Sequence, residues 1–582
     1  MNNMKSYSDL KKNIKKLKEP RELKEIELAL LGDTATQFLR TAIEGYGYEA
    51  GYRAEIYESE YDVMETEILD ASSGLYEKKR DYVVLYMSTE RAYEAFTRLD
   101  EKERTSFARQ YVDRIRDYWS VVRERTGAGI IQADFNRVDA GIYGQYGNRL
   151  KSAWEYQYVM LQHLLAEAAA DTERVYLLGL DSIQTSLGRA VFCDMRFYYE
   201  ARMSISTDAL PAVAKGAWDI IAAADGRVRK CLVLDLDNTL WGGVIADDGL
   251  SGIELGELGK GRIYCDIQRW CLELKKRGVI LAVCSKNDED NAREPFEKHP
   301  DMVLRPDDIA MFVANWEDKA SNIRRIQETL NIGMDSMVFL DDQAFERNLV
   351  KEMIPEITVP SLPEEPAEWP AYLKSLDLFE TSSVSEGADR TKQYREEANR
   401  RTEKARHADV GEYLESLEMK ACCAPFDEFR YPRIAELSQR SNQFNLRTVR
   451  YTEDQIKDIA QSDRYITLYF TLEDRFGDYG LVSCMIMEKT GEGEAFIDTW
   501  FMSCRVLQRG MEEFIMNCAV EEAAKQGIEI LTGEYIPTKK NRMVEKIYEK
   551  YGFKSQGDGR YRLETGKYKK LETKISKEAP SE

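Results

Sequence analysis

The chain has 582 residues, of which 43% are hydrophobic and 32% are charged, and its formal net charge is −21. Domains commonly hold roughly 100–200 residues, so this length predicts several domains. So acidic a chain argues against nucleic acid as a partner, because binding to phosphates needs a basic surface. No run approaches the ~20 apolar residues of a membrane span, and the first residues lack the apolar core of a signal peptide. We therefore expect a cytoplasmic protein with no membrane partner.

Cysteine and histidine usage limits the chemistry open to the chain. Its ten cysteines form no CxxC pair and no other metal-ligand spacing, so we expect free thiols in a reducing compartment. The three histidines, His163, His299 and His407, have no histidine or cysteine neighbour at zinc spacing. A zinc site and a histidine-based catalytic triad are therefore both disfavoured.

The first part of the chain predicts a basic lead-in helix at residues 1–24 and an α/β domain at residues 25–227. Strand-like apolar runs alternate in this domain with longer amphipathic segments at residues 89–125 and 150–171. Strands separated by helices indicate a parallel, doubly wound sheet. The expected strands are residues 25–33, 81–88, 128–135 and 174–181.

The end of the first expected strand, Gly32-Asp33-Thr34, resembles the opening motif of SGNH-type hydrolases. Those enzymes carry a serine where this chain has Thr34. No closing Asp-x-x-His follows, since residues 194–204 read DMRFYYEARMS. The resemblance implies an SGNH-like scaffold for residues 25–227, and we expect this scaffold to be degenerate and without hydrolase activity.

A second alternating unit covers residues 228–360 and again predicts a doubly wound parallel sheet. Its expected strands are residues 231–235, 279–285, 310–315 and 336–341, and its expected helices are residues 263–277, 288–297 and 319–330. A proline-rich stretch and a highly charged helical stretch form the expected linker, residues 361–419.

The last unit, residues 420–556, predicts meander strands, one helix at residues 508–526 and a Tyr-Gly-Phe near its end. This order resembles the GNAT acetyltransferase fold and implies an α+β domain. The stretch RVLQRGMEE (505–513) has one glycine where acetyl-CoA binders of that fold carry an R/Q-x-x-G-x-G/A loop. We therefore expect the domain to dock a carrier protein or a pantetheine arm, and the alternative is that it binds acetyl-CoA. Residues 557–582 are predicted to be a loose polar tail.

Carboxylates follow two expected strands of the middle unit. Asp235 and Asp237 come after CLVL, and Asp341 and Asp342 come after MVFL. Charge is costly to desolvate, so paired acids at the end of an apolar strand need a chemical reason. Carboxylate oxygens suit Mg²⁺, and the carboxyl ends of strands are where doubly wound folds place their sites. The first acid could attack phosphorus, and the second could protonate the leaving oxygen.

Such a site also needs a hydroxyl and a cation for the phosphoryl oxygens. Ser285 ends the expected strand 279–285, and Lys319 opens the expected helix 319–330. A lysine at a helix start is ordinary when it stands alone. The four features are the Asp235-Asp237 pair, Ser285, Lys319 and the Asp341-Asp342 pair. Together, in this order, they are a more specific signal than any one of them alone, and they predict phosphoryl chemistry.

The DxDxT sequence, strand-end serine, helix lysine and strand-end acidic pair resemble the four motifs of the haloacid dehalogenase (HAD) superfamily. The stretches SKNDED, ANWEDKASNI and SNQFNLRT (441–448) narrow the resemblance to the FkbH-like family of subfamily IIIC, over roughly residues 194–553. One departure is QAFER (343–347), where the family pattern is Asn-Pro-Ala-Glu-Arg. The resemblance implies that Asp235 is the nucleophile and Asp237 the general acid/base. It implies that Thr239 and Ser285 bind phosphate and that Lys319 bridges the nucleophile and the phosphate. The implied ligands of Mg²⁺ are Asp235, the Asp237 carbonyl, Asp341 and Asp342.

Residues beside the motifs are further candidates for substrate or phosphate binding, namely Trp241, Gly242, Gly243, Lys286 and Asn287. Cys284 is a candidate nucleophile that would attack an acyl phosphate and form a thioester, and Lys286 would lower its pKa if the side chains converge. The alternative is a core cysteine, because VILAVC is an apolar strand and adjacent strand residues face opposite sides. Both interpretations of Cys284 stay open.

The family resemblance also implies a substrate class. FkbH-like proteins take 1,3-bisphosphoglycerate, load the glyceryl group on an acyl carrier protein and remove phosphate, in polyketide or related biosynthesis. The sequence contains no recognisable carrier domain, so we expect the carrier protein to act in trans through its phosphopantetheine thiol. The alternatives are a plain HAD phosphomonoesterase acting on a small phosphorylated metabolite, and a scaffold that docks carrier proteins.

Overall fold

The computed structural model describes residues 5–17, 23–381, 388–407, 409–441, 443–538 and 541–579. The chain divides into two compact units. Unit 1 consists of Met1–Val279, Asp290–Leu304 and Ile332–Gly387, and unit 2 consists of Ile280–Glu289, Arg305–Asn331 and Ala388–Glu582. Within the described ranges, no helix has the length and apolar character that crossing a membrane requires.

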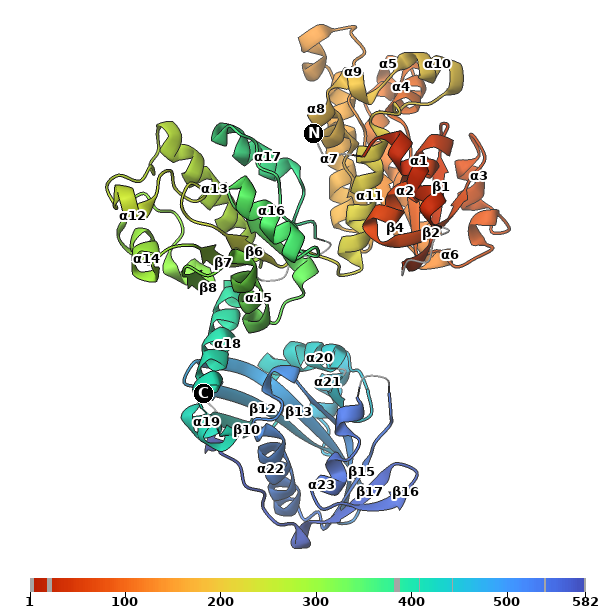
Figure 1. The fold of residues 1–582 in the computed structure, drawn as a ribbon. Coiled ribbons are helices and arrows are strands. Elements are labelled where there is room, and N and C mark those ends of the chain that lie inside the picture. Colours follow the sequence, from red (N-terminus) through yellow and green to blue (C-terminus); the bar gives the residue numbers. More distant parts are fainter. Residues whose placement is uncertain are drawn as a thin grey trace. The chain divides into compact units, whose positions relative to one another are not determined.

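Unit 1 begins with a five-stranded parallel sheet in the order β2-β1-β3-β4-β5. Figure 1 labels β1, β2 and β4 of this sheet. The strands are β1 (Lys24–Gly32), β2 (Tyr52–Glu58), β3 (Tyr82–Tyr86), β4 (Gly129–Ala133) and β5 (Val175–Leu178). Four of them are the strands expected from the sequence, and the edge strand β2 was not expected. The parallel α/β architecture of this domain is confirmed.

Helices cover both faces of this sheet, because its central strands are apolar at successive positions. Leu28 and Leu30 pack with α2 and α11 in one core, whereas Ala29 and Leu31 pack with α6 and α7 in another. The helices are α2 (Gln37–Ala50), α3 (Met64–Leu69), α4 (Thr89–Thr97), α5 (Glu101–Arg104), α6 (Phe107–Thr126), α7 (Trp154–Ala170), α8 (Leu180–Leu187), α9 (Arg189–Phe192), α10 (Met195–Ala201) and α11 (Leu210–Ala224).

The amphipathic segment expected at residues 89–125 forms three helices, α4, α5 and α6. Asp100 starts α5 as its N-cap: its side chain accepts the Glu103 N–H, and the Glu103 side chain accepts the Asp100 N–H in return. The expected lead-in helix is present as α1 (Tyr7–Lys16), and residues 1–4 and 18–22 lie outside the described residues. A Cβ at Gly45 of α2 would lie 2.3 Å from the Leu10 carbonyl oxygen, so the close approach of α1 needs this glycine.

Unit 1 also holds two parallel strands of the middle region, β6 (Cys231–Leu234) and β9 (Met337–Leu340). All eight residues of these strands are buried. The helices that accompany them are α12 (Ile245–Asp248), α13 (Gly259–Lys276), α16 (Ala344–Met353) and α17 (Trp369–Ser375), and α14 (Glu289–Lys298) begins at the edge of unit 2 and continues in unit 1.

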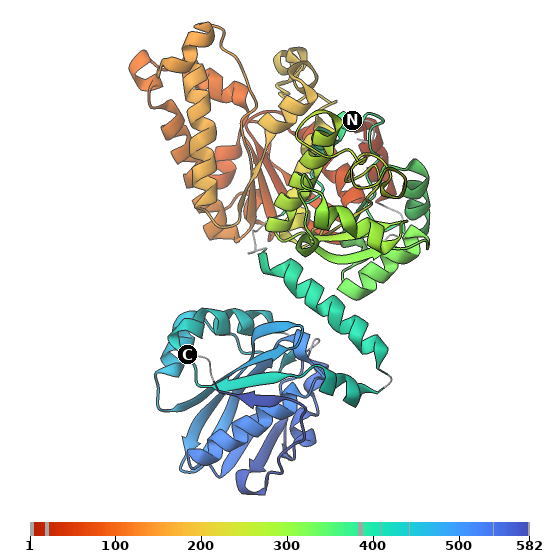
Figure 2. The same ribbon diagram turned by 90° about the vertical axis from the view of Figure 1, so that its left-hand side faces the viewer.

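Unit 2 contains the other two strands of the middle region, β7 (Ile280–Ser285) and β8 (Ile309–Ala314), which pair in parallel, together with α15 (Lys319–Leu330). The charged helix expected in the linker is α18 (Ala388–Arg406), which contacts β7, β8 and α15. Figure 2 shows α18 as a long teal helix. Arg400 of α18 makes a bidentate bond to the fully buried Asp474 at 2.7 and 2.9 Å. Residues 382–387 of the expected linker lie outside the described residues.

The carboxyl-terminal part of unit 2 is a mixed sheet that follows the path β16-β17-β15-β14-β13-β12-β10-β18, with β11 paired to β14. Its strands are β10 (Lys420–Ala424), β11 (Phe444–Asn445), β12 (Tyr465–Asp474), β13 (Gly477–Gly491), β14 (Glu494–Met502), β15 (Ile530–Glu534), β16 (Lys554–Gly557), β17 (Arg560–Glu564) and β18 (Ser576–Glu578). Its helices are α19 (Val410–Ser416), α20 (Tyr431–Arg440), α21 (Glu453–Ala460), α22 (Met511–Lys525) and α23 (Ile547–Lys550).

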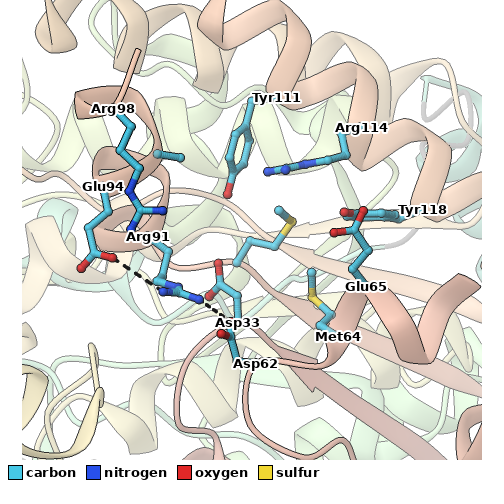
Figure 3. A pocket seen from close by; sticks show the side chains of 12 residues that line it. Asp33, Asp62, Met64, Glu65, Arg91, Glu94, Arg98, Tyr111, Arg114 and Tyr118 are labelled. Atoms are coloured by element: carbon cyan, nitrogen blue, oxygen red, sulfur yellow. Dashed lines mark hydrogen bonds and ion pairs between the residues drawn. The ribbon is translucent and has the colours of Figure 1, made fainter.

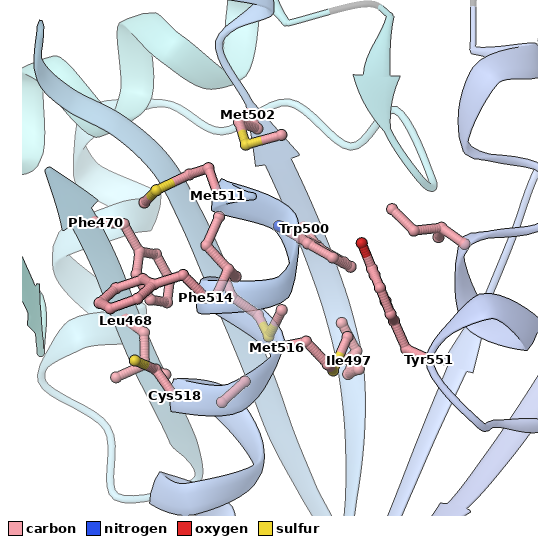
Figure 4. Packing of buried hydrophobic residues seen from close by; sticks show 14 of the residues in the cluster. Leu468, Phe470, Ile497, Trp500, Met502, Met511, Phe514, Met516, Cys518 and Tyr551 are labelled. Carbon is pink, nitrogen blue, oxygen red and sulfur yellow. The ribbon is translucent and has the colours of Figure 1, made fainter. Parts of the chain in front are cut away.

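Alternating side chains of the central strands build two cores in this domain. Leu468 and Phe470 pack toward α22, which contributes Phe514 (Figure 4). Tyr469, between them, packs instead with α20 and α21 on the other face. Successive strand residues point to opposite faces, so one strand serves both layers. The α+β class expected for this region is confirmed.

The prediction of a loose tail after residue 556 is wrong for part of that segment. Residues 560–564 form β17, which pairs antiparallel with β15, and residues 576–578 form β18, which pairs in parallel with β10. Tyr561 and Leu563 alternate with charged residues and are buried in the domain core. That alternation is the period of a strand, but it spans only five residues. Residues 580–582 lie outside the described residues.

Candidate active site

Two aspartates meet because they follow neighbouring strands in matched register. Leu234, the last residue of β6, lies opposite Leu340, the last residue of β9. Asp235 and Asp341 come next, and the Asp235 N–H donates to the Leu340 carbonyl oxygen at 2.9 Å. Parallel pairing therefore brings the two carboxylates to the same edge of the sheet.

Asp342 joins these two acids in a group that could hold a metal ion. Each of the three offers a carboxylate oxygen, and these oxygens all lie within 4.8 Å of one another. Asp235 is 3% exposed and Asp341 is 0% exposed, whereas Asp342 is partly buried. Three converging carboxylate oxygens fit a hard divalent cation such as Mg²⁺ and do not fit a soft metal. The structure thus brings together three of the expected metal ligands.

The loop after Asp235 holds the second aspartate of the motif in place. Asp237 Oδ1 accepts the indole N–H of Trp241 at 2.9 Å and the backbone N–H of Ile245 at 3.0 Å. Trp241 is fully buried, and its ring lies edge-on to Phe296 at 6.1 Å between centroids. Trp241 therefore orients Asp237, and a direct contact of Trp241 with substrate stays a prediction.

Two residues with left-handed backbone conformations shape the loop after Asp235. Asn238 has a φ of +55° and Gly243 a φ of +91°, and the Gly243 N–H donates to Asn238 Oδ1 at 2.9 Å. Asparagine tolerates the left-handed region better than most residues, and glycine occupies it without strain. A Cβ at Gly242 would lie 2.6 Å from Glu254 Oε2. Both glycines shape the loop, and their contact with phosphate stays a prediction.

The Thr239 hydroxyl connects the two acid-bearing loops. The Asp342 N–H donates to Thr239 Oγ1 at 3.1 Å, and Thr239 is fully buried. Arg347 is a positioning residue whose role was not assigned from the sequence. Its guanidinium donates to the carbonyl oxygens of Asp341, at 2.8 Å, and of Asp342. The retained Glu-Arg of QAFER was the only sequence signal for it.

Unit 2 carries the remaining expected residues. Ser285 ends β7 opposite Ala314 of β8 and is 2% exposed. Lys319 is the first residue of α15 and is also 2% exposed, and the preceding Asp318 caps the helix by accepting the Ser321 N–H at 2.8 Å. Lys286 is half-buried, and the buried Asn287 accepts the N–H of its own neighbour at 2.9 Å. The roles of these side chains toward substrate stay predictions.

Comparison with known proteins identifies the family of the chain. Residues 27–222 match the family described as FkbH, N-terminal domain. A solved structure, the N-terminal part of a Bacteroides fragilis protein containing a phosphatase domain complexed with Mg, is 42% identical, with a TM-score of 0.62. The match covers 65% of this chain and all of that one. The chain belongs to the FkbH-like family of the HAD superfamily. A search among curated proteins found no match.

Acetyltransferase structures match the carboxyl-terminal region of this FkbH-like protein. One is the ribosomal-protein-S18-alanine N-acetyltransferase from Escherichia coli, at 17% identity and a TM-score of 0.20, covering 25% of this chain and 94% of that one. Another is the spermidine N-acetyltransferase from Vibrio cholerae in complex with CoA and spermine, at 12% identity and a TM-score of 0.20, covering 26% and 98%. Likenesses at this level say nothing about activity.

Cys284 of this FkbH-like protein lies inside the domain. It is 0% exposed, and its Sγ lies 3.7 Å from the carbonyl oxygen of Lys319. Full burial in an apolar strand is typical of a core cysteine, whereas reactive cysteines are partly exposed. The burial favours the core interpretation in this conformation, and a nucleophilic role requires that the thiol become accessible.

Asp33, from the expected SGNH-like motif, lies directly after β1 at the edge of a cavity (Figure 3). Its Oδ1 accepts the Ser88 N–H at 2.8 Å. Burial raises the pKa of the Asp33 carboxyl to about 7, although the Ser88 hydrogen bond and the Arg91 charge oppose the rise. The adjacent Thr34 is 1% exposed, and its hydroxyl has no hydrogen-bond partner. That this scaffold lacks hydrolase activity stays a prediction.

The raised pKa of Asp33 predicts a pH-dependent effect of Asp33→Asn on stability. The unfolded chain ionises this group near pH 4 and the folded chain near pH 7, so the free energy of unfolding of wild type falls as pH rises between these values. We expect Asp33→Asn to exceed wild type by on the order of 2–4 kcal/mol at pH 8 and to match it near pH 4. Urea unfolding at both pH values measures this. The exposed Asp117→Asn is the control, and an equal effect of Asp33→Asn at both pH values would contradict the prediction.

Proposed function

We propose that this protein is a Mg²⁺-dependent phosphatase and glyceryl transferase. It takes an acyl phosphate such as 1,3-bisphosphoglycerate, removes phosphate and loads the glyceryl group on an acyl carrier protein that acts in trans. The group formed by Asp235, Asp341 and Asp342 carries this proposal, since three buried or half-buried carboxylates converge at one sheet edge. The 42% identity to a phosphatase domain complexed with Mg supports the metal and the phosphatase activity.

The proposed phosphatase chemistry begins at Asp235. A carboxylate oxygen of Asp235 attacks phosphorus, a new P–O bond forms, and the bond from phosphorus to the leaving oxygen breaks. Asp237, held by Trp241 and the Ile245 N–H, gives its proton to that leaving oxygen and later takes one from the water that hydrolyses the aspartyl phosphate. When bound, Mg²⁺ supplies positive charge that lowers the repulsion between carboxylates and phosphate.

The proposed roles of the phosphate-binding residues are those that the family resemblance implies. In this proposal Ser285 and Thr239 donate hydrogen bonds to the phosphoryl oxygens, and Lys319 neutralises their charge. Lys319 is 2% exposed and opens a helix, an arrangement that restricts its side chain. Lys286, Asn287 and the Trp241-Gly242-Gly243 loop are the proposed contacts for the rest of the substrate.

The acyl-transfer step is the finer part of the proposal. A thiolate attacks the acyl carbon, a C–S bond forms, and the C–O bond to phosphate breaks so that inorganic phosphate leaves. Cys284 is the proposed first acceptor, and the phosphopantetheine thiol of the carrier then takes the glyceryl group by thioester exchange. Because Cys284 is 0% exposed, this route requires a local opening of the strand end around it. The alternative functions remain a plain phosphomonoesterase and a carrier-docking scaffold.

Intact-protein mass spectrometry tests the transfer proposal. The full chain is incubated with Mg²⁺ and 1,3-bisphosphoglycerate formed in situ, in wild-type, Cys284→Ala and Asp235→Asn forms. We expect a glyceryl-sized adduct on wild type that Cys284→Ala lacks, and a heavier adduct that retains phosphate on Asp235→Asn. Cys271→Ala, which removes another fully buried thiol, is the matched control. Phosphate release without any adduct would reduce the function to that of a phosphatase and leave Cys284 a core residue.

A further inference from the structure

Two cysteines of the carboxyl-terminal domain face the same layer of its core. The first, Cys423, lies on β10 directly opposite Phe470 of β12. Directly opposite residues of an antiparallel pair point to the same face of the sheet, and Phe470 packs toward α22. Cys423 therefore points toward α22 as well, and it packs against the same core from a partly buried position.

The second cysteine, Cys518, approaches this place from the helix. It lies on α22, is 4% exposed and belongs to the same hydrophobic cluster as Phe470. Figure 4 shows it on the side of α22 that is turned toward Leu468 and Phe470. A strand and a helix that are far apart in the sequence thus bring two thiols to one side of the sheet.

The two thiols act directly on each other. The Cys423 thiol has the largest effect on Cys518 and lowers the pKa of that thiol, although burial opposes the change. Cys518 in turn raises the pKa of the Cys423 thiol more than burial does. Opposite shifts of this kind arise when one thiol stabilises the thiolate beside it. The two sulfur atoms are therefore neighbours.

Lysine side chains lie near the pair. Lys577 belongs to β18, which pairs with β10, and it forms an ion pair with Glu521 of α22 at 3.7 Å. Lys577 and Lys570 both lower the pKa of the Cys518 thiol. Positive charge favours the thiolate, which is the form that oxidants react with. The surroundings differ from those of Cys484, which is fully buried and whose pKa is raised by that burial.

A small molecule can reach the pair from the side of Cys423. This residue is partly exposed, as reactive cysteines commonly are. Strand β18 ends at Glu578, opposite Cys422, so it does not extend alongside Cys423. Cys422 itself packs with the core on the other face of the sheet and is not part of the pair.

We propose that Cys423 and Cys518 form a reversible disulfide when the protein meets a small peroxide, and that this bond links β10 to α22. The thiolate attacks one peroxide oxygen, the O–O bond breaks, and the leaving hydroxide takes up a proton and becomes water. The other thiol attacks the sulfur of the resulting sulfenic acid, an S–S bond forms, and a second water leaves. Thiol reductants reverse the reaction by exchange.

Such a pair fits free thiols in a reducing compartment, where disulfides are usually transient and sense oxidants. The proposal does not depend on the phosphatase or transferase function, because neither cysteine belongs to the carboxylate group at β6 and β9.

Peptide mapping of the full chain tests the disulfide. The protein is treated with hydrogen peroxide, its remaining thiols are alkylated, and it is digested with trypsin without reduction. Cleavage after lysine and arginine releases residues 421–430, which contain Cys423, and residues 510–525, which contain Cys518. We expect a linked peptide that is lighter by two hydrogen atoms than the sum of the two, and we expect dithiothreitol to remove it.

Variants assign the link. Cys423→Ala and Cys518→Ala should each abolish the linked peptide, whereas Cys422→Ala, in the same tryptic peptide as Cys423, should retain it. Cys484→Ala removes another buried thiol and should also retain it. Oxidised wild type should have a higher Tm than reduced wild type, because a disulfide across a long loop restricts the unfolded chain. Cys518→Ala should show no such rise.

Three results would overturn the proposal. Absence of the linked peptide from oxidised wild type would do so without requiring any variant to fold. A link that persists in Cys423→Ala and is lost in Cys422→Ala would assign the bond to the wrong thiol. A linked peptide without a higher Tm would show that the bond does not strengthen the attachment of β10 to α22. Failure of the phosphatase proposal would leave each of these outcomes unchanged.

Discussion

Asp235→Asn is expected to lower the rate of phosphate release by at least about a thousandfold, as loss of a covalent nucleophile commonly does. An amide oxygen is a poor nucleophile, and the substitution also removes one of three carboxylates that converge within 4.8 Å. The loop should keep its position, because the bond from the Asp235 N–H to the Leu340 carbonyl oxygen does not involve the side chain. Initial rates with acetyl phosphate and Mg²⁺ measure the effect.

The matched control is Asp335→Asn. Asp335 is exposed and lies just before β9, so it is at the opposite end of the strand that leads to Asp341. Its replacement changes the net charge equally and should leave the rate within about twofold, since surface substitutions have small effects. If Asp235→Asn kept a rate similar to that of Asp335→Asn, Asp235 would not be the nucleophile, and another acid would have to carry the reaction.

The meeting of Asp235 and Asp341 could be predicted because both follow short apolar strands of a parallel sheet. Strands β6 and β9 are fully buried, so their sequences are almost continuously apolar and their ends are sharp. Each strand ends directly before its acid, and parallel pairing then determines which side chains share the edge. The sequence contains all of this information locally.

The hydrogen bond from Trp241 to Asp237 was not predicted, because it depends on distant packing. A tryptophan next to two glycines is compatible with an exposed substrate contact. The structure buries it fully against Phe296, which belongs to α14, and this orientation aims the indole N–H at Asp237. The two contacts of Arg347 with the acidic loop likewise arise from the fold, since they join α16 to carbonyl oxygens that precede it.

Strands with little buried surface were also not predicted from the sequence. Strand β2 is at the edge of its sheet and carries several partly or fully exposed residues, and β18 is exposed at all three positions. Edge strands have one neighbour and a weaker alternation of apolar residues, so their existence depends on the strand beside them. The cavity near Asp33 is a similar case, because its walls come from segments far apart in the sequence.

Asp341→Asn is expected to abolish the stabilisation of the protein by Mg²⁺. A ligand that binds only the folded state raises the free energy of unfolding by about 2.7 kcal/mol when its concentration is 100 times its Kd. Asp341 is fully buried beside Asp235, and its Oδ1 already accepts the Gln343 N–H at 2.8 Å. This bond restricts the orientation of the Asp341 carboxylate. Replacing the carboxylate by an amide should therefore remove a metal ligand that no other side chain of the loop can replace.

Differential scanning fluorimetry across a Mg²⁺ titration, with EDTA as the zero point, measures this effect without requiring activity. Wild type and Asp335→Asn should show a concentration-dependent rise in Tm of several degrees. Asp341→Asn should show none, and Asp342→Asn should show a smaller rise, because Asp342 is less buried than the other two acids. A full rise in Asp341→Asn would mean that the three converging carboxylates do not form the Mg²⁺ site, and the metal would have to be sought elsewhere in the chain.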